Sequence, residues 1–136
     1  MLLVEPVRLM FPELEAELTV TNPASFMMQR LLIIPARRSL MKKGKDTLYL
    51  HDTLLLFSHA GRLHPEVCAQ AARVAKTLTR DQRARGERIR SELENPEHLS
   101  IREAATQAAA TGRAGPNSPE AIARVIRLGL TELWPR

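Results

Sequence analysis

Residues 22–34 of this chain read NPASFMMQRLLII, and this stretch marks a change from an extended pattern to a helical one. Asn22 is a residue type that commonly caps helices, and proline is favoured at the first helical position, where Pro23 would lie. Pro35 ends the pattern. The residues that recur at helical spacing are Phe26, Met27, Arg30, Leu31 and Ile34. The sequence therefore predicts a helical domain over residues 23–136.

The residues before Asn22 favour β-strands. Apolar residues at 14, 16, 18 and 20 alternate with glutamates and threonines, which is the period of a half-buried strand. A first run rich in Leu and Val covers residues 2–10, and Pro12 separates the two runs. We therefore expect residues 1–22 to form a short two-stranded extended segment. Two strands alone are marginal in water, so they need the helices, a partner or a sheet that this chain lacks.

The rest of the chain predicts further helices separated by turn signals. A Leu-rich helix over about 47–59, capped by Asp46 and closed by Gly61, should be central to the fold. Later helices are expected over about 65–78, 79–94, 100–111 and from Ser118-Pro119 onward. Thr79 with Gln82 and Ser100 with Glu103 are the expected capping boxes. The fold class is therefore mainly α: a single domain of about six helices in an orthogonal or bundle-like array.

The composition limits the possible functions. Apolar residues make up 44% of the chain and aromatic residues only 4%, so the core must be built from aliphatic residues, Met and Ala. The formal net charge is +5, and residues 59–136 carry 13 Lys and Arg against 9 Asp and Glu. This balance favours anionic partners such as nucleic acid. The apolar runs are too short to span a bilayer, so we expect a soluble, cytoplasmic protein without a membrane partner.

Catalytic and metal-binding patterns are weak. His51, His59, His64 and Cys68 lie close in sequence but match no zinc-binding spacing, and Cys68 falls on a predicted core stripe. The row Glu13, Glu15 and Glu17 could hold Mg²⁺, but the solvated face of a strand is the favoured interpretation. We expect no catalytic residue, no metal site and no cofactor.

A first basic cluster is the strongest candidate binding site. The sequence predicts a loop that ends at the start of the helix capped by Asp46, and a helix N-terminus with nearby Lys and Arg attracts phosphate. Asp46 would compete for the same amides, so solvated loop charge is the alternative interpretation. The cluster consists of Arg37, Arg38, Lys42, Lys43 and Lys45.

A second basic row would fall within about 100° of arc if residues 65–94 formed one continuous helix. Glu87 interrupts the row, and no aromatic residue is interleaved for base stacking. Contacts would therefore be made to phosphate without sequence specificity, and a solvated face is the alternative. The row consists of Arg73, Lys76, Arg80, Arg83 and Arg90.

Residues 18–57 resemble part of the bacterial nucleotidyltransferase-like proteins, the group that includes abortive-infection toxins. The shared pattern is a short strand, a Pro-led helix with a basic-Leu pair, an Arg-containing loop and a Lys-Asp pair that opens a Leu-rich helix. Here the pattern reads Thr19–Pro23, Ser25–Leu32, Arg37-Arg38, Lys43–Asp46 and Leu54–Leu56. The resemblance implies a C-terminal helical region packed against the end of a nucleotidyltransferase sheet. It also implies that Lys43 and Lys45 face the nucleotide phosphates.

One departure from the family pattern bears on activity. The metal-binding carboxylates of the family follow a Gly-Ser turn, and this chain has no glycine before Gly44. We therefore expect either a C-terminal fragment or a short gene product without the catalytic half, and no nucleotide transfer by this chain alone. Glu15 or Glu17 would be at most a remaining third carboxylate.

Three hypotheses follow for the function. The first is a non-catalytic helical module that contacts nucleotide or nucleic-acid phosphates and needs a catalytic partner, docked on the N-terminal strands. The second is a stand-alone helical interaction protein that forms a homodimer and binds an anionic partner. The third is a small-molecule binder with a pocket among its helices, although the same aliphatic residues suit an ordinary core.

Overall fold

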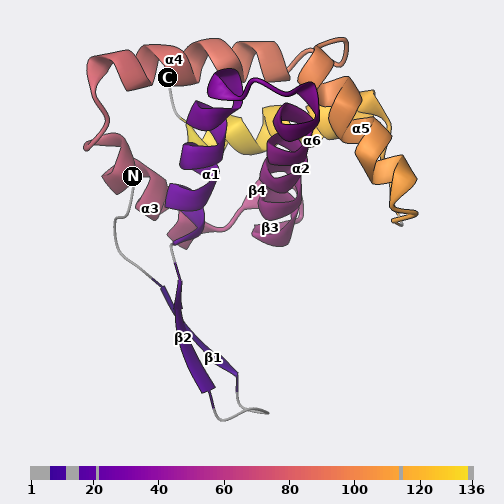
Figure 1. Cartoon of the computed structure of the whole chain (residues 1–136). Helices are drawn as coiled ribbons and strands as arrows, with labels where there is room; N and C mark the ends of the chain where they lie inside the picture. Colours follow the sequence, from indigo (N-terminus) through magenta and orange to yellow (C-terminus); the bar gives the residue numbers. More distant parts are fainter. Residues whose placement is uncertain (1–6, 12–15, 21, 114, 135–136) are drawn as a thin grey trace.

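The computed structural model describes residues 7–11, 16–20, 22–113 and 115–134. This part of the chain contains six α-helices and two short two-stranded sheets (Figure 1), which confirms the mainly helical class. None of these helices is both long and apolar enough to cross a membrane. The helices are α1 (Pro23–Ile33), α2 (Leu40–Leu56), α3 (Pro65–Ala75), α4 (Arg80–Leu93), α5 (Leu99–Ala110) and α6 (Pro119–Leu133), and a 3₁₀ helix, η2 (Ile34–Ala36), follows α1.

Several helix starts were predicted correctly because their caps are local. The Asn22 side chain accepts a hydrogen bond of 2.8 Å from the Ser25 amide, and Pro23 is the first residue of α1. Ser118 caps α6 ahead of Pro119 in the same way. A full capping box between Thr79 and Gln82 starts α4. Each cap satisfies backbone donors that the first turn leaves without a helical partner.

Other helix bounds differ from the prediction. Ser39, not Asp46, caps α2, so the helix begins at Leu40 and the expected basic loop is largely its first two turns. His98, not Ser100, caps α5, and the expected box with Glu103 does not start that helix. The continuous helix considered for the second basic row is broken between Ala75 and Arg80, because α3 and α4 are separate helices.

Both sheets are antiparallel pairs. β1 (Val7–Phe11) pairs with β2 (Ala16–Val20), with Val7 opposite Val20, and this hairpin extends away from the helices in Figure 1. β3 (Ser58–His59) pairs with β4 (Arg62–Leu63) in the middle of the chain, and this second sheet was not predicted. Its turn is made by Ala60 and Gly61, whose φ angles are 54° and 77°. Gly61 therefore serves this turn and does not close the preceding helix.

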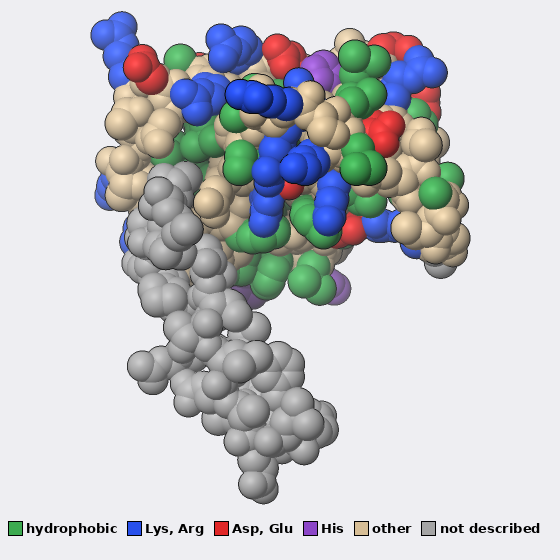
Figure 2. Space-filling view, viewed as in Figure 1, with side chains coloured by type: hydrophobic (Ala, Val, Ile, Leu, Met, Phe, Trp, Pro, Cys, Tyr) green, Lys and Arg blue, Asp and Glu red, His purple; other side chains and the backbone are tan. Residues whose placement is uncertain are grey.

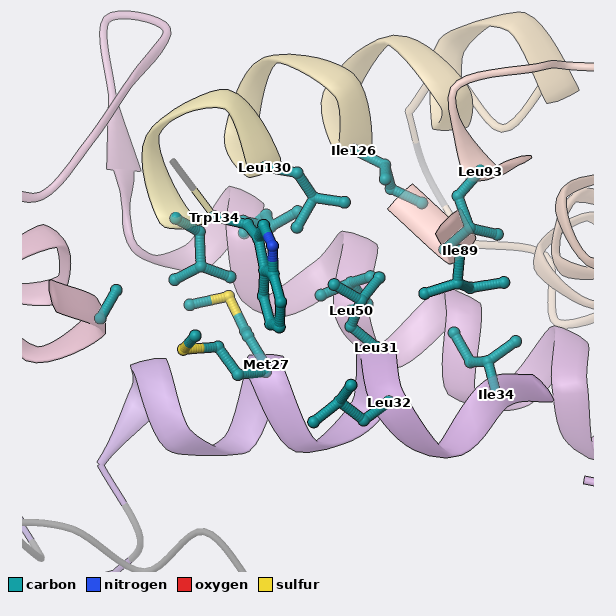
Figure 3. Close-up of a cluster of buried hydrophobic side chains, with 14 of the residues drawn as sticks. Met27, Leu31, Leu32, Ile34, Leu50, Ile89, Leu93, Ile126, Leu130 and Trp134 are labelled. Atoms are coloured by element: carbon teal, nitrogen blue, oxygen red, sulfur yellow. The ribbon is translucent and has the colours of Figure 1, made fainter. Parts of the chain in front are cut away.

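The core is built around α1, which contacts α2, α3 and α4. Its Met27 and Leu31 side chains are fully buried, and Figure 3 shows Leu31 beside Leu50 of α2. Trp134, which follows α6, adds the largest side chain of this cluster. As expected from the composition, the core is otherwise aliphatic, with Met and Ala filling the space between helices.

Gly86 is needed where α4 meets the C-terminal tryptophan. A Cβ atom at Gly86 would lie 2.2 Å from the Cζ2 atom of Trp134, which is far inside van der Waals contact. Trp134 is only 4% exposed and packs in the core, so its ring has little room to move. The glycine therefore allows the indole to cover α4.

We predict that Gly86→Ala lowers the free energy of unfolding by about 1–3 kcal/mol, because the cost of overpacking exceeds the gain in helix propensity. Urea unfolding followed by circular dichroism measures the change. Ala84→Gly, an exposed position of the same helix, reports the propensity term alone, at about 1 kcal/mol. A more stable Gly86→Ala protein would contradict the close approach of Trp134.

Candidate functional site

A buried carboxylate organises the corner between α1 and α2. Asp46, on the second turn of α2, is only 3% exposed. Its Oδ1 atom accepts a hydrogen bond of 3.0 Å from Nη1 of Arg30 on α1. Its Oδ2 atom accepts one of 2.7 Å from Nε of Arg37, which follows η2. Both carboxylate oxygens are thereby used to hold guanidinium groups from two preceding segments.

Aromatic rings contact two cations at this corner, Arg30 and Lys45. The guanidinium carbon of Arg30 lies 4.8 Å from the centroid of the Phe26 ring and 5.7 Å from that of Tyr49. The Lys45 ammonium also lies 5.7 Å from the Tyr49 ring centroid. Such cation–π contacts are each worth about 0.5–1 kcal/mol at exposed sites. The Tyr49 ring therefore contacts both the Arg30 guanidinium and the Lys45 ammonium group.

These residues surround a pocket of about 290 Å³. Lys42, Lys45, Asp46 and Tyr49 share one face of α2, since they are spaced three, four and seven residues apart. Four cations and one carboxylate line the pocket, so its formal charge is 4 − 1 = +3. Figure 2 shows Lys and Arg side chains gathered on the face of the molecule that α1 and α2 form. We call this site the basic pocket; its lining residues are Arg30, Arg37, Lys42, Lys45, Asp46 and Tyr49.

Several donors of the basic pocket are available to a ligand. Arg37 uses its Nε atom on Asp46, and within the described part of the chain its two terminal nitrogens make no hydrogen bond. The Lys42 and Lys45 ammonium groups likewise have no carboxylate partner among the described residues. A concave site with several unpaired cations forms strong charge-assisted hydrogen bonds with an anion.

The first predicted basic cluster is only partly assembled into this pocket. Arg37, Lys42 and Lys45 line it. Arg38 is exposed and Lys43 is half-buried, and neither is among the lining residues. Arg30 and Tyr49 were not predicted as site residues. Their sequence signal is weak, although Tyr49 lies seven residues after Lys42 and thus two helical turns further along the same face.

The second predicted basic row does not form one face. Arg90 is buried and donates a hydrogen bond to the Trp134 carbonyl, so it completes the C-terminal end of the fold. Arg83 donates to the Ala75 carbonyl at 2.6 Å and so covers the end of α3. Arg73 lies 3.9 Å from Glu66. Lys76 and Arg80 are exposed on either side of the break between α3 and α4.

Of the predicted histidine and cysteine group, His64 and Cys68 have structural partners, whereas His59 is exposed. His64 caps α3, and Cys68 is half-buried with its Sγ atom 4.0 Å from the Leu63 carbonyl. Burial and the nearby Glu132 raise the pKa of the Cys68 thiol, which makes it a poor nucleophile. Among the described residues, no group of three or more His, Cys, Asp and Glu is placed to hold a metal ion. Glu13 and Glu15 lie outside the described residues, and Glu17 is opposite Met10 in the hairpin.

A second, partly buried charge network joins α2 to the segment after α5. His51 is 3% exposed, and its Nδ1 atom lies 2.9 Å from Oδ1 of Asp52. Arg113 donates to both oxygens of Asp52, at 2.8 Å to Oδ2. Burial lowers the pKa of His51 and outweighs the opposing effect of Asp52. Burial alone would raise the pKa of Asp52, but its hydrogen bonds from Arg113 and His51 lower it overall.

Comparison of this chain with protein-family models, with curated proteins and with solved structures finds no match. The resemblance to nucleotidyltransferase-like proteins therefore stays a prediction.

We predict that stability falls as the pH decreases below about 6.5, because the unfolded chain protonates His51 more readily than the folded chain does. The lowered pKa of Asp52 adds a further loss of stability below about pH 4. Urea unfolding at a series of pH values measures both effects. His51→Gln should remove the loss that begins near pH 6.5, whereas His59→Gln, at an exposed position, should retain it. An unchanged profile in the His51 variant would contradict this assignment.

Proposed function

We propose that this chain is a non-catalytic helical module that binds the phosphate groups of a nucleotide or a nucleic acid in the basic pocket. One observation carries the proposal: four cations surround one pocket, and the single carboxylate among them is committed to two of those cations. The pocket is therefore concave and carries a net positive charge. Phosphate is the common biological anion that such a set of Arg and Lys donors recognises.

The same geometry argues against catalysis by the pocket. Among the described residues Asp46 is the only carboxylate that lines the pocket, and each of its oxygens accepts a hydrogen bond from a guanidinium group. A carboxylate held in this way serves to position the two cations, so the described lining offers no unpaired carboxylate for proton transfer or for a metal ion. The basic pocket therefore supplies positive charge and oriented donors. Any chemical step on the bound molecule would come from a partner that carries the catalytic carboxylates.

The family resemblance agrees in part with this proposal. It implies that Lys43 and Lys45 face nucleotide phosphates, and Lys45 lines the basic pocket. Lys43 does not, because α2 starts at Leu40 and places Lys43 on another face of the helix. We therefore propose that Lys42, and not Lys43, contacts the phosphate together with Lys45.

Self-association through the hairpin is a second candidate function. The register places Val7, Leu9 and Phe11 of β1 directly opposite residues of β2 that are also apolar, so these positions share one face of the hairpin. The opposing residues are Ala16, Leu18 and Val20. Three facing pairs of apolar residues in one two-stranded hairpin suit a second copy of the chain, since identical surfaces match under two-fold symmetry. A catalytic partner is the competing occupant.

We predict that replacing Lys42 and Lys45 together by Gln weakens binding of a fluorescently labelled single-stranded oligonucleotide by roughly tenfold or more, because two phosphate-contacting charges are lost. The wild-type affinity should also decrease with rising salt concentration. Fluorescence anisotropy at two salt concentrations measures both effects.

The matched control replaces Arg124 and Arg127 of α6 by Gln, which removes the same charge at two exposed positions. These residues line a different pocket, beside Glu94 and Glu120, so the control should retain nearly full affinity. If the two double variants lose affinity equally, binding reflects net charge alone and the basic pocket is not the site. If no phosphate ligand binds the wild-type chain, the proposal fails.

For the hairpin, we predict a homodimer by light scattering that dissociates in the Leu18→Lys variant. The buried charge would oppose contact between two apolar faces. Thr19→Lys changes the adjacent position on the other face of β2 and should leave the dimer intact. A monomeric wild-type chain at micromolar concentration would exclude the second copy as the occupant of this face.

A further inference from the structure

We infer that the basic pocket takes a terminal phosphate, a phosphomonoester at the end of a nucleic-acid strand or on a free nucleotide, in preference to the internal phosphodiesters of a strand. This inference rests on the proposed function and specifies its ligand. It depends on how the positive charge is arranged, which donors are fixed, and what lies beside the pocket.

The charge of the basic pocket is concentrated in one place. Its cations come from α1, from the residue after η2 and from the first turns of α2, and they surround one cavity. From Lys42 to Tyr49 the lining covers about 10 Å of helix. A formal charge of +3 in this space suits a dianion better than a monoanion. A phosphomonoester carries close to two charges at neutral pH, whereas an internal diester carries one.

The neighbouring surface does not continue the positive charge along α2. The next turns after Tyr49 carry Asp52, which is held by Arg113, and the exposed Leu55 and Leu56. Leu56 is 75% exposed. Proteins that bind a strand by its backbone use a groove of positive charge that follows several phosphates. Here the ion-paired Asp52 and the two leucines end such a groove on the Tyr49 side of the pocket.

The pocket also favours the phosphate over the base. In the part of the chain that the structure describes, Tyr49 is the only aromatic residue that lines the pocket, and its ring already contacts the Arg30 and Lys45 cations. A base would have to displace one of them before it could stack. By contrast, Arg37 is held through Nε by Asp46 at 2.7 Å, which directs its terminal nitrogens as a fixed pair of donors. Such a pair fits two oxygens of one phosphate.

The test compares one internally labelled single strand of about 12 nucleotides in three forms: with a 5′-phosphate, with a 3′-phosphate and with hydroxyl groups at both ends. Fluorescence anisotropy against the intact wild-type chain measures each affinity. We expect at least one phosphorylated form to bind roughly tenfold more tightly than the hydroxyl form. This preference should decrease below about pH 6, where the phosphomonoester takes up a proton.

Adenosine 5′-monophosphate and adenosine, used as competitors, distinguish the two sources of the terminal phosphate. Competition by the monophosphate alone would indicate that a free nucleotide suffices. If neither competes while the phosphorylated strand still binds more tightly, the end of a strand is the ligand. Both results support the inference.

Arg37→Lys keeps the charge and removes the paired donors, so it should reduce the preference for the phosphorylated strand more than it reduces binding of the hydroxyl strand. Arg124→Lys on α6 is the matched control and should change neither. Equal affinity for the hydroxyl and phosphorylated strands would overturn this inference while the proposed function stands. Failure of every phosphate ligand to bind would overturn the proposed function itself.

Discussion

The buried carboxylate of Asp46 is the constraint on which the α1–α2 corner and the basic pocket both depend. A carboxylate that is 3% exposed is stable as an anion only if its oxygens are hydrogen-bonded and its charge is balanced. Arg30 and Arg37 meet this requirement from two segments that lie 16 and 9 residues away. The ion pairs therefore fix the path of the chain through η2. Because two guanidinium groups balance one carboxylate, they also leave positive charge on the surface beside α2.

The other side of α2 is held by close packing, which keeps the pocket residues in place. A Cβ atom at Gly44 would lie 2.4 Å from the Glu103 side chain of α5, and one at Gly129 of α6 would lie 2.6 Å from Leu54. The Ala-rich sequence of α5 predicts such an approach, and Ala104 and Ala108 are fully buried. With α5 and α6 against its inner faces, α2 presents the row from Lys42 to Tyr49 outward as a rigid surface.

The sequence predicted those features of the fold that depend on neighbouring residues. Asn22-Pro23, Thr79 with Gln82, and Ser118-Pro119 start their helices as expected, because a cap and its amide are three residues apart. Asp46 was wrongly predicted as a helix cap. Its actual partners are Arg30 of α1 and Arg37 after η2, which the local sequence around Asp46 does not indicate. Arg90 was expected in the second basic row, facing phosphate or solvent, for a similar reason: its partner, the Trp134 carbonyl, is 44 residues away. The site was therefore predicted as a cluster of charges, and its shape, its aromatic residue and its bound carboxylate required tertiary structure.

The start of α2 carries lysines where three other helices of the described chain carry an acidic residue, and α1 and α5 also lack an acidic residue there. The first turns of α3, α4 and α6 contain Glu66, Asp81 and Glu120, which complement the positive end of the helix dipole. The first turn of α2 has no acidic residue, and Lys42 and Lys43 lie close to it. Each unfavourable charge at such a position costs about 0.3–1 kcal/mol. Local rules of this kind are most often broken at functional sites. A bound phosphate would supply the missing negative charge, so binding and the stability of α2 are thermodynamically linked.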